Sequence, residues 1–243
     1  MSALLEVRAL TKRFGGVTAV DGCTFEVSAG SITALIGPNG SGKTTVFNMV
    51  TGYLRPDAGA VSFDGRRASR PDPARFYRAG LSRTFQQPRV FRELTLVENL
   101  AVAANRPWWA LLGRDVPPTD RRRAEEVLAD FRLGDLMGNK ARELSFGQQK
   151  LLEFAAVLMG RPKLVLLDEP TAGVNPVMVE TMEQHIRDLH RQGITFLVVE
   201  HEMNLVMRLC DPVIVLDHGA KLAEGRPAEV QRDPLVLDAY LGT

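Results

Sequence analysis

The chain has 243 residues, enough for one large domain or two small ones, and 45% of them are hydrophobic, so the composition argues for a sizeable core and against disorder. A formal net charge of +1 argues against a polyanion-binding surface, so no nucleic-acid partner is expected. Cys23 and Cys210 lack metal-ligand and Cys-x-x-Cys spacing, which indicates small apolar fillers in a reducing compartment. The longest apolar runs, 164–167 and 194–199, are only strand-length and no signal peptide is evident, so a cytosolic chain is predicted.

The first part of the chain is predicted to form strands around one helix. Apolar and polar residues alternate over 4–10 and 23–27, as in half-buried antiparallel strands. The nearly continuous apolar run at 31–37 indicates a strand buried on both faces, and 44–52 reads as a helix that ends at a glycine. Residues 59–65 predict another strand, at a sheet edge.

The middle of the chain is predicted to be helical. Helical patterns cover 94–105 and 121–131, and a third helix begins at Ser145. Between the first two, 105–120 is rich in helix breakers and is predicted to be a loop. These helices are expected to form a subdomain inserted near 88–160.

Strands and helices alternate again in the last part of the chain. The apolar run 163–169 predicts a strand, 177–193 a helix, and 194–201 a second strand. Residues 212–219 predict a further strand followed by a short hairpin. Such alternation is typical of an α/β fold with a parallel sheet.

A phosphate-binding loop is predicted at 37–45, "GPNGSGKTT". It matches G-x-x-x-x-G-K-[ST] at every fixed position and stands between a buried strand and a helix, so a chance glycine-rich turn is disfavoured. Backbone N–H groups would surround a di- or triphosphate, Lys43 would reach the β- and γ-phosphates, and the Thr44 hydroxyl would ligate Mg²⁺. The residues expected to bind the nucleotide are Gly37, Pro38, Asn39, Gly40, Ser41, Gly42, Lys43, Thr44 and Thr45.

Catalytic side chains are predicted at the ends of two strands. In "LVLLDEP" (164–170), Asp168 is placed to hold Mg²⁺, through water, and Glu169 to polarise a water for in-line attack on the γ-phosphate. A strand end followed by an acidic loop is the plainer alternative, which the phosphate loop makes less favourable. His201, at the end of the next strand, is predicted to bridge the γ-phosphate and the water.

Other polar residues have more ordinary alternatives. Gln86 is a neutral amide that would contact both Mg²⁺ and the attacking water, but the residues alone do not exclude an ordinary surface glutamine. The remaining histidines, His185, His190 and His218, lie in a predicted helix and turn and are expected to face solvent.

A second anion site is predicted in "LSFGQQK", 144–150. Ser145 precedes Gln148 by three residues, the spacing of a capping box. The N–H groups and the dipole at such a helix start favour an anion, and Gly147 permits close approach. A capping box that only begins the helix is compatible with the same residues.

These motifs together resemble the nucleotide-binding subunit of ATP-binding cassette (ABC) proteins over nearly the whole chain. A phosphate loop alone also occurs in kinases, GTPases and helicases, but "LSFGQQ" before "LVLLDEP" is similar to the ABC signature. The resemblance implies a single ABC ATPase domain, 1–243, with an α/β P-loop NTPase (RecA-like) core. That core would comprise 1–87 and 161–243, including an N-terminal antiparallel β subdomain, and 88–160 would be the inserted α-helical subdomain.

The resemblance also implies roles for individual residues. Phe14 matches the aromatic residue that stacks on adenine, Gln86 the Q-loop glutamine, and His201 the switch histidine. Two positions depart from the usual pattern. Phe146 stands where many ABC proteins have glycine, and Asn175 stands where aspartate is common.

ABC domains act as head-to-tail pairs, and this implies a shared site. Ser145 and Gly147, with Gln148, would contact the γ-phosphate of ATP held by the loop of a second cassette, either a copy or a sister subunit. ATP and Mg²⁺ are the implied cofactors. The other implied partners are two membrane permease subunits and, indirectly, a periplasmic or extracellular solute-binding protein, which places the chain at the cytoplasmic face of a bacterial-type membrane.

The finer resemblance is to the ATP-binding subunits of branched-chain amino acid importers. Systems for urea or short amides are close alternatives. A second alternative is a soluble ABC ATPase that acts on nucleic acid or ribosomes, but such proteins resemble tandem cassettes or carry a long coiled-coil insertion, and this chain has neither. A third alternative is a P-loop kinase, in which the signature helix and Glu169 would have no role. The stretches that carry the resemblance are 13–22, 83–100, 144–155, 172–176, 199–207 and 239–243.

An apolar groove for a short permease helix is predicted just after Gln86, with subdomain core as the alternative. Trp108 and Trp109 would extend this interface or, in the plainer interpretation, pack in a loop or the core. The groove residues are Pro88, Val90, Phe91 and Leu94.

Overall fold

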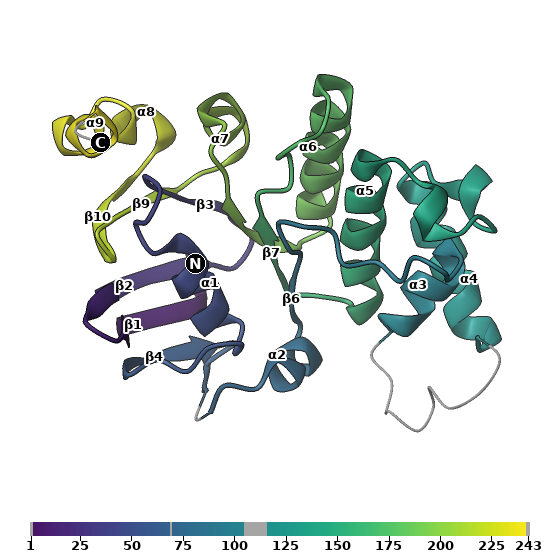
Figure 1. Ribbon diagram of the computed structural model, residues 1–243, viewed down its shortest axis with the longest axis horizontal. Helices are drawn as coiled ribbons and strands as arrows, with labels where there is room; N and C mark the ends of the chain where they lie inside the picture. Colours follow the sequence, from purple (N-terminus) through teal and green to yellow (C-terminus); the bar gives the residue numbers. More distant parts are fainter. Residues whose placement is uncertain (1, 69, 105–115, 242–243) are drawn as a thin grey trace.

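The computed structural model describes residues 2–68, 70–104 and 116–241, which form two sheets with helices packed around them (Figure 1). The antiparallel sheet has the order β2-β1-β4-β5, and the larger sheet has the order β10-β9-β3-β8-β7-β6. The strands are β1 (Ala3–Phe14), β2 (Val17–Ser28), β3 (Ile32–Ile36), β4 (Ala58–Phe63), β5 (Arg66–Arg67), β6 (Leu81–Arg83), β7 (Leu164–Asp168), β8 (Thr195–Val199), β9 (Val213–Asp217) and β10 (Ala220–Gly225). The helices are α1 (Lys43–Val50), α2 (Pro73–Ala79), α3 (Leu96–Val102), α4 (Pro118–Asp130), α5 (Phe146–Val157), α6 (Pro176–Arg191), α7 (Met203–Leu209), α8 (Pro227–Val230) and α9 (Pro234–Leu241).

Apolar side chains cover both faces of the larger sheet. Strands β3, β6, β7, β8 and β9 pair in parallel, and β10 pairs antiparallel to β9 at one edge. Along β7, Val165 and Leu167 join the core that includes helices α3 to α7, whereas Leu164 and Leu166 join the core around α1. This two-residue alternation explains why the strand reads as continuously apolar.

Helix α1 lies between the two sheets. Its buried residues Val46, Phe47, Met49 and Val50 share one apolar cluster with residues of β1, β2 and β4 and with one face of the larger sheet. The start of α1 is therefore held against the carboxyl end of β3.

Helices α3, α4 and α5 are inserted between β6 and β7 and lie beyond the β6 edge of the larger sheet (Figure 1). They share a core in which Phe131 and Phe154 meet edge-on, with ring centroids 5.2 Å apart. This arrangement confirms the predicted fold class of an α/β P-loop core with an antiparallel β subdomain and an inserted helical subdomain. Trp108 and Trp109 lie outside the described residues.

Some element predictions need correction. Strand β4 is not at an edge, because the two-residue strand β5 pairs with it through Ser62 and Phe63. Residues 118–120 belong to α4 rather than to the predicted loop, since proline is favourable in the first turn of a helix. Helix α3 is shorter than the helical pattern over 94–105.

The prediction that three histidines face solvent is wrong for His185. Its ring is buried and stacks on Phe131 at 4.3 Å between centroids, and burial lowers the pKa of His185. His190 is partly covered, with Nε2 2.9 Å from the carbonyl oxygen of Gly30. His218 is exposed, as predicted. Helical spacing places His185 on the same face of α6 as the buried Met182 and Ile186, and Phe131, the residue that follows α4, covers its ring.

Both cysteines are free and buried, and burial raises their pKa values, to about 11 for Cys23 and about 12 for Cys210. Protonated, inert thiols fit the prediction of small apolar fillers. Among the described helices, none is long and apolar enough to cross a membrane.

Candidate functional site

The glycine-rich loop between β3 and α1 has a backbone that only glycine tolerates at two positions. Gly37 and Gly42 have φ values of 151° and 98°. A Cβ atom at Gly37 would lie 2.1 Å from the carbonyl oxygen of Leu216, and one at Gly42 would lie 2.6 Å from that of Ala19. The motif glycines therefore allow the loop to turn tightly against β9 and β2.

Lys43 turns back over this loop at the start of α1. Its Nζ donates to the carbonyl oxygens of Gly37 and Pro38, each at 2.8 Å. Burial lowers the pKa of Lys43, while the charges of Glu169 and Asp168 act to raise it. The loop thus holds an ammonium group at its centre, facing two carboxylates. In the same turn Thr44 is exposed and Thr45 half-buried.

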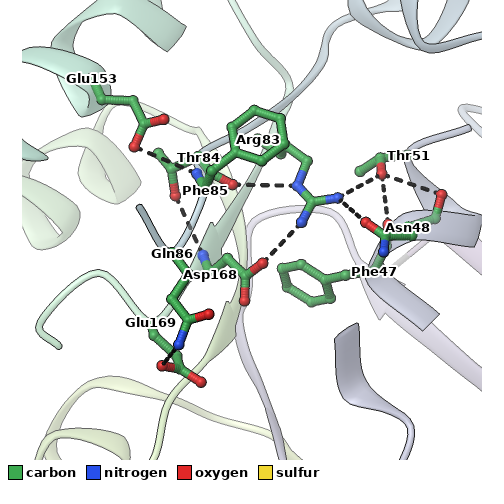
Figure 2. Close-up of polar contacts among 10 residues, drawn as sticks. All are labelled: Phe47, Asn48, Thr51, Arg83, Thr84, Phe85, Gln86, Glu153, Asp168 and Glu169. Carbon is green, nitrogen blue, oxygen red and sulfur yellow. Dashed lines mark hydrogen bonds and ion pairs between the residues drawn. The ribbon is translucent and has the colours of Figure 1, made fainter. Parts of the chain in front are cut away.

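Each carboxylate oxygen of Glu169 lies within hydrogen-bond distance of a residue that follows another strand of the sheet. Gln86 Nε2 donates to Oε2 at 2.8 Å, and His201 Nε2 lies 2.6 Å from Oε1. Figure 2 shows the Gln86 amide directed at the Glu169 carboxylate. The Glu169 side chain is 17% exposed, so it keeps access to water. Since β6, β7 and β8 are neighbours, the three residues meet at the carboxyl edge of the sheet.

The backbone of Glu169 is strained and held from two sides. Its φ of +49° lies in the left-handed region, which is costly for a residue with a Cβ. The Glu169 N–H donates to the carbonyl oxygen of Val199 at 2.9 Å, and its carbonyl oxygen accepts from Lys150 Nζ at 2.8 Å. These bonds turn the side chain away from the strand direction and toward Gln86 and His201.

Asp168, the last residue of β7, forms an ion pair with Arg83. The guanidinium Nη2 donates to Oδ2 at 2.8 Å, and the two side chains are 9% and 5% exposed. Burial raises the pKa of Asp168 and lowers that of Arg83, and their mutual attraction opposes both shifts. The sequence analysis missed Arg83, although it is the first residue of the stretch 83–100 that carries the family resemblance.

The buried carboxylate of Glu153 on α5 holds the segment that carries Gln86. The N–H groups of Phe85 and Arg89 donate to its two oxygens at 3.4 and 3.1 Å. Burial raises the pKa of Glu153 to about 7, against the lowering effect of these bonds and of Lys150. An acidic residue inside the apolar run "LLEFAAV" was the available signal, and the sequence reasoning did not use it.

We expect Glu153 to make stability depend on pH. Because its folded-state pKa is raised, the stabilising contribution is complete below pH 4.5 and is lost as pH rises through about 7. Between pH 5 and 8, chemical denaturation should show a decrease on the order of 1 kcal/mol that Glu153→Gln removes. An exposed control, Glu180→Gln, should retain the wild-type pH dependence. Equal pH profiles for wild type and Glu153→Gln would contradict this role.

The capping box predicted at "LSFGQQK" is formed, but away from the phosphate loop. The Gln148 N–H donates to Ser145 Oγ at 3.3 Å, and the Ser145 N–H donates to Gln148 Oε1 at 2.9 Å. In Figure 1 α5 and α1 lie on opposite sides of β7. Gly147 lies against Met178, where an added Cβ would be 3.2 Å from Cγ. Ser145, Gly147 and Gln148 therefore do not join the cluster around Glu169.

The two departures from the usual ABC pattern have local contacts. Phe146 is partly exposed, with Lys150 Nζ 5.5 Å from its ring centroid, and its ring lies close to Gly173. Asn175 is the N-cap of α6, where its Oδ1 accepts from the Met178 N–H at 2.9 Å. Asparagine is as good an N-cap as aspartate, so this local function does not need a carboxylate.

Phe14, the predicted adenine-stacking residue, is exposed at the end of β1. Its side chain is 51% exposed, with Lys12 Nζ 5.5 Å from the ring centroid. Lys12 pairs with Val20 of β2, whose neighbour Ala19 lies against Gly42. The ring therefore lies in the part of the β subdomain that adjoins the phosphate loop.

The site combines a glycine loop that bears a lysine after β3, an acidic pair at the end of β7, and a helical insertion whose helix α5 begins with a capping box. These features define a nucleotide-hydrolysing protein of the cassette class. The family model for ABC transporters matches residues 20–172, and a model for branched-chain amino acid ATP-binding cassette transporters matches 220–243. The chain belongs to the ABC transporter family, as an ATP-binding subunit that hydrolyses ATP.

Individual relatives agree over nearly the full length. The chain is 40% identical to the high-affinity branched-chain amino acid transport ATP-binding protein BraF of Pseudomonas aeruginosa, covering 98% of each chain. A solved ADP-bound cassette of an ABC transporter is 35% identical, with a TM-score of 0.90 over 100% of both chains. A dimeric cassette in a post-hydrolysis state with ADP and Pi is 25% identical, with a TM-score of 0.79 over 92% of this chain and 98% of that one.

Proposed function

We propose that the chain is the ATPase subunit of an importer for branched-chain amino acids and that Glu169 is its general base. The supporting observation is the cluster in which Gln86 and His201 hold the Glu169 carboxylate at the sheet edge that also bears Lys43. The solute is inferred from the similarity to BraF and from the family match at the C-terminus. Uptake of leucine, but not urea, by vesicles containing the assembled transporter would test the solute.

In this proposal each residue of the cluster has one role. Lys43, already held at the loop centre, donates to the β- and γ-phosphates in place of its bonds to Gly37 and Pro38. Glu169 accepts a proton from the attacking water, and His201 and Gln86 orient its carboxylate. Phe14 stacks on the adenine.

The residues at the sheet edge fit a Mg²⁺ ion that also binds phosphate. Mg²⁺ prefers oxygen ligands, takes few from the protein, and neutralises charge on the phosphates when bound. Thr44 is exposed, and Asp168 has one oxygen, Oδ1, with no partner among the described residues. No group of three or more His, Cys, Asp and Glu side chains among those described could hold a metal unaided, which is consistent with a site completed by nucleotide. Thr44 and Asp168 are the proposed ligands, with Gln86 nearby.

We further propose that the site is completed by the signature helix of a second cassette, a copy or a sister subunit. The start of α5 is exposed at Ser145 and separate from its own chain's loop, so its free anion-binding end is available to a partner's ATP. Two permease subunits would bind near Phe91, which is 55% exposed, and would hold the chain at the cytoplasmic face of the membrane. Of the predicted groove residues, Pro88, Val90 and Leu94 are only partly exposed.

Replacement of Ser145 by arginine tests the shared site. A long cation at the helix start would block approach of the partner's γ-phosphate, so ATP hydrolysis by the assembled transporter should fall at least about tenfold. Nucleotide binding by the isolated subunit, measured by calorimetry, should stay within about twofold. Ser145→Ala is the control for the lost cap, which costs about 1 kcal/mol of stability. Wild-type turnover of the arginine variant in the assembled transporter would refute the model.

A further inference from the structure

Arg83, which the proposed chemistry does not use, has every guanidinium nitrogen bonded. Beside the Asp168 ion pair, Nη1 donates to Asn48 Oδ1 at 2.7 Å and to Thr51 Oγ1 at 3.2 Å. Nε donates to the carbonyl oxygen of Thr84 at 3.2 Å. Figure 2 shows this arginine between α1 on one side and Asp168 on the other. One buried side chain thus connects α1, β6 and β7.

Three aromatic rings restrict the position of this guanidinium. Its carbon lies 4.7 Å from the centroid of Phe85 and 5.7 Å from those of Phe47 and Tyr53. Contact with aromatic rings favours the planar cation and limits its movement. The Arg83 fork is therefore preorganised before any ligand arrives.

The partners of Arg83 at α1 share a side with Thr44. Asn48 lies on α1 and Thr51 caps its C-terminal end, and with Thr44 they occupy positions i, i+4 and i+7, which lie on one side of a helix. Asn48 and the following Thr51 accept from Arg83, and Arg83 in turn donates to Asp168. The arginine therefore ties the Thr44 face of α1 to the end of β7.

We infer that Arg83 is a positioning residue that sets the spacing and orientation of Thr44 and Asp168 for a divalent cation. It occupies Oδ2 of Asp168 and so directs the other oxygen, Oδ1, to the cation. This inference rests on the proposed Mg²⁺ site. A lysine would keep the charge but could not bond to Asn48, Thr51 and Asp168 in one planar fork.

Binding of a fluorescent ATP analogue to the intact chain, with Mg²⁺ and with EDTA, tests this role without requiring hydrolysis. In Arg83→Lys the half-saturating Mg²⁺ concentration should rise about 10- to 100-fold, as is typical when a residue that hydrogen-bonds to a metal ligand is changed. Affinity in EDTA should stay within about twofold, because the loop 37–45 is unchanged. The pair Asn48→Ala and Thr51→Val, which leaves the Asp168 bond intact, should give a smaller rise in the same direction.

Arg78→Lys is the matched control, because Arg78 is an exposed arginine on α2 whose Nε donates to the carbonyl oxygen of Ala74 in the same helix. It should leave both measurements unchanged. An Arg83→Lys protein that melts as wild type and keeps the wild-type Mg²⁺ requirement would overturn the inference. So would an equal loss of affinity with Mg²⁺ and with EDTA, which would mark a purely structural residue. If Asp168→Asn also left the Mg²⁺ requirement unchanged, the proposed cation site itself would be wrong.

Discussion

Replacement of Glu169 by glutamine is expected to lower kcat for ATP hydrolysis at least about 100-fold and to leave ATP affinity within about twofold, because loss of a general base typically costs 10²–10⁴-fold. Glutamine keeps the shape of the side chain, so contacts with Gln86 and His201 are largely preserved. Without a carboxylate, no group at this position can take the proton of the attacking water. Phosphate release measures the rate, and size-exclusion chromatography with ATP should show a trapped nucleotide-bound dimer.

Glu180→Gln is the matched control, since Glu180 is an exposed glutamate on the neighbouring helix α6. It should hydrolyse ATP at the wild-type rate and form no trapped dimer. Hydrolysis by Glu169→Gln at the wild-type rate would show that another group is the base. The strained backbone at residue 169 would then need a different explanation.

Replacement of Lys43 by methionine is expected to weaken ATP binding about 100-fold. The ammonium is partly desolvated and held at the loop centre, and loss of its charge-assisted hydrogen bonds to phosphate corresponds to roughly 2–3 kcal/mol. Methionine preserves most of the apolar stem, and removal of a buried charge should not lower the melting temperature. Isothermal titration calorimetry with ATP gives the affinity directly.

A lysine outside the site separates this effect from a general change of charge. The Lys140 side chain is 42% exposed and paired with Glu93, so Lys140→Met should bind ATP as the wild type does. ATP affinity of Lys43→Met within a few-fold of wild type would contradict the assignment of Lys43 to the phosphates.

The parts of the site that lie within one short stretch were predictable. The glycines, Lys43 and Thr44 of the loop 37–45 have a fixed spacing, because a tight turn must lead directly into the start of a helix. The structure contains both the turn and the helix start. The capping box of Ser145 and Gln148 is equally local and is confirmed. Buried strands were recognisable because β3, β7 and β8 are apolar on both faces.

Residues whose surroundings come from distant segments were not predictable. Arg83 is bonded to Asn48 and Asp168, which are 35 and 85 positions away, and the sequence contains no periodic signal for such a pairing. Glu153 is an acidic residue in an apolar stretch of α5. The sequence does not show that its oxygens accept from the N–H groups of Phe85 and Arg89, on either side of Gln86. His185 lies on the buried face of α6 with Met182 and Ile186, but the sequence does not show that the ring of Phe131, 54 positions earlier, stacks on it.

The amino-acid order alone is therefore sufficient for the phosphate loop, the helix caps and the class of fold, because each depends on contacts within a few residues or on a repeating burial pattern. Which strands become neighbours determines whether Gln86, Glu169 and His201 come into contact. It also determines whether Arg83 can connect α1 to Asp168. Parallel strands bring their carboxyl ends to one edge only after distant apolar segments have packed on both faces of the sheet. The tertiary structure thus determines how these side chains meet, through the long-range burial that orders the strands.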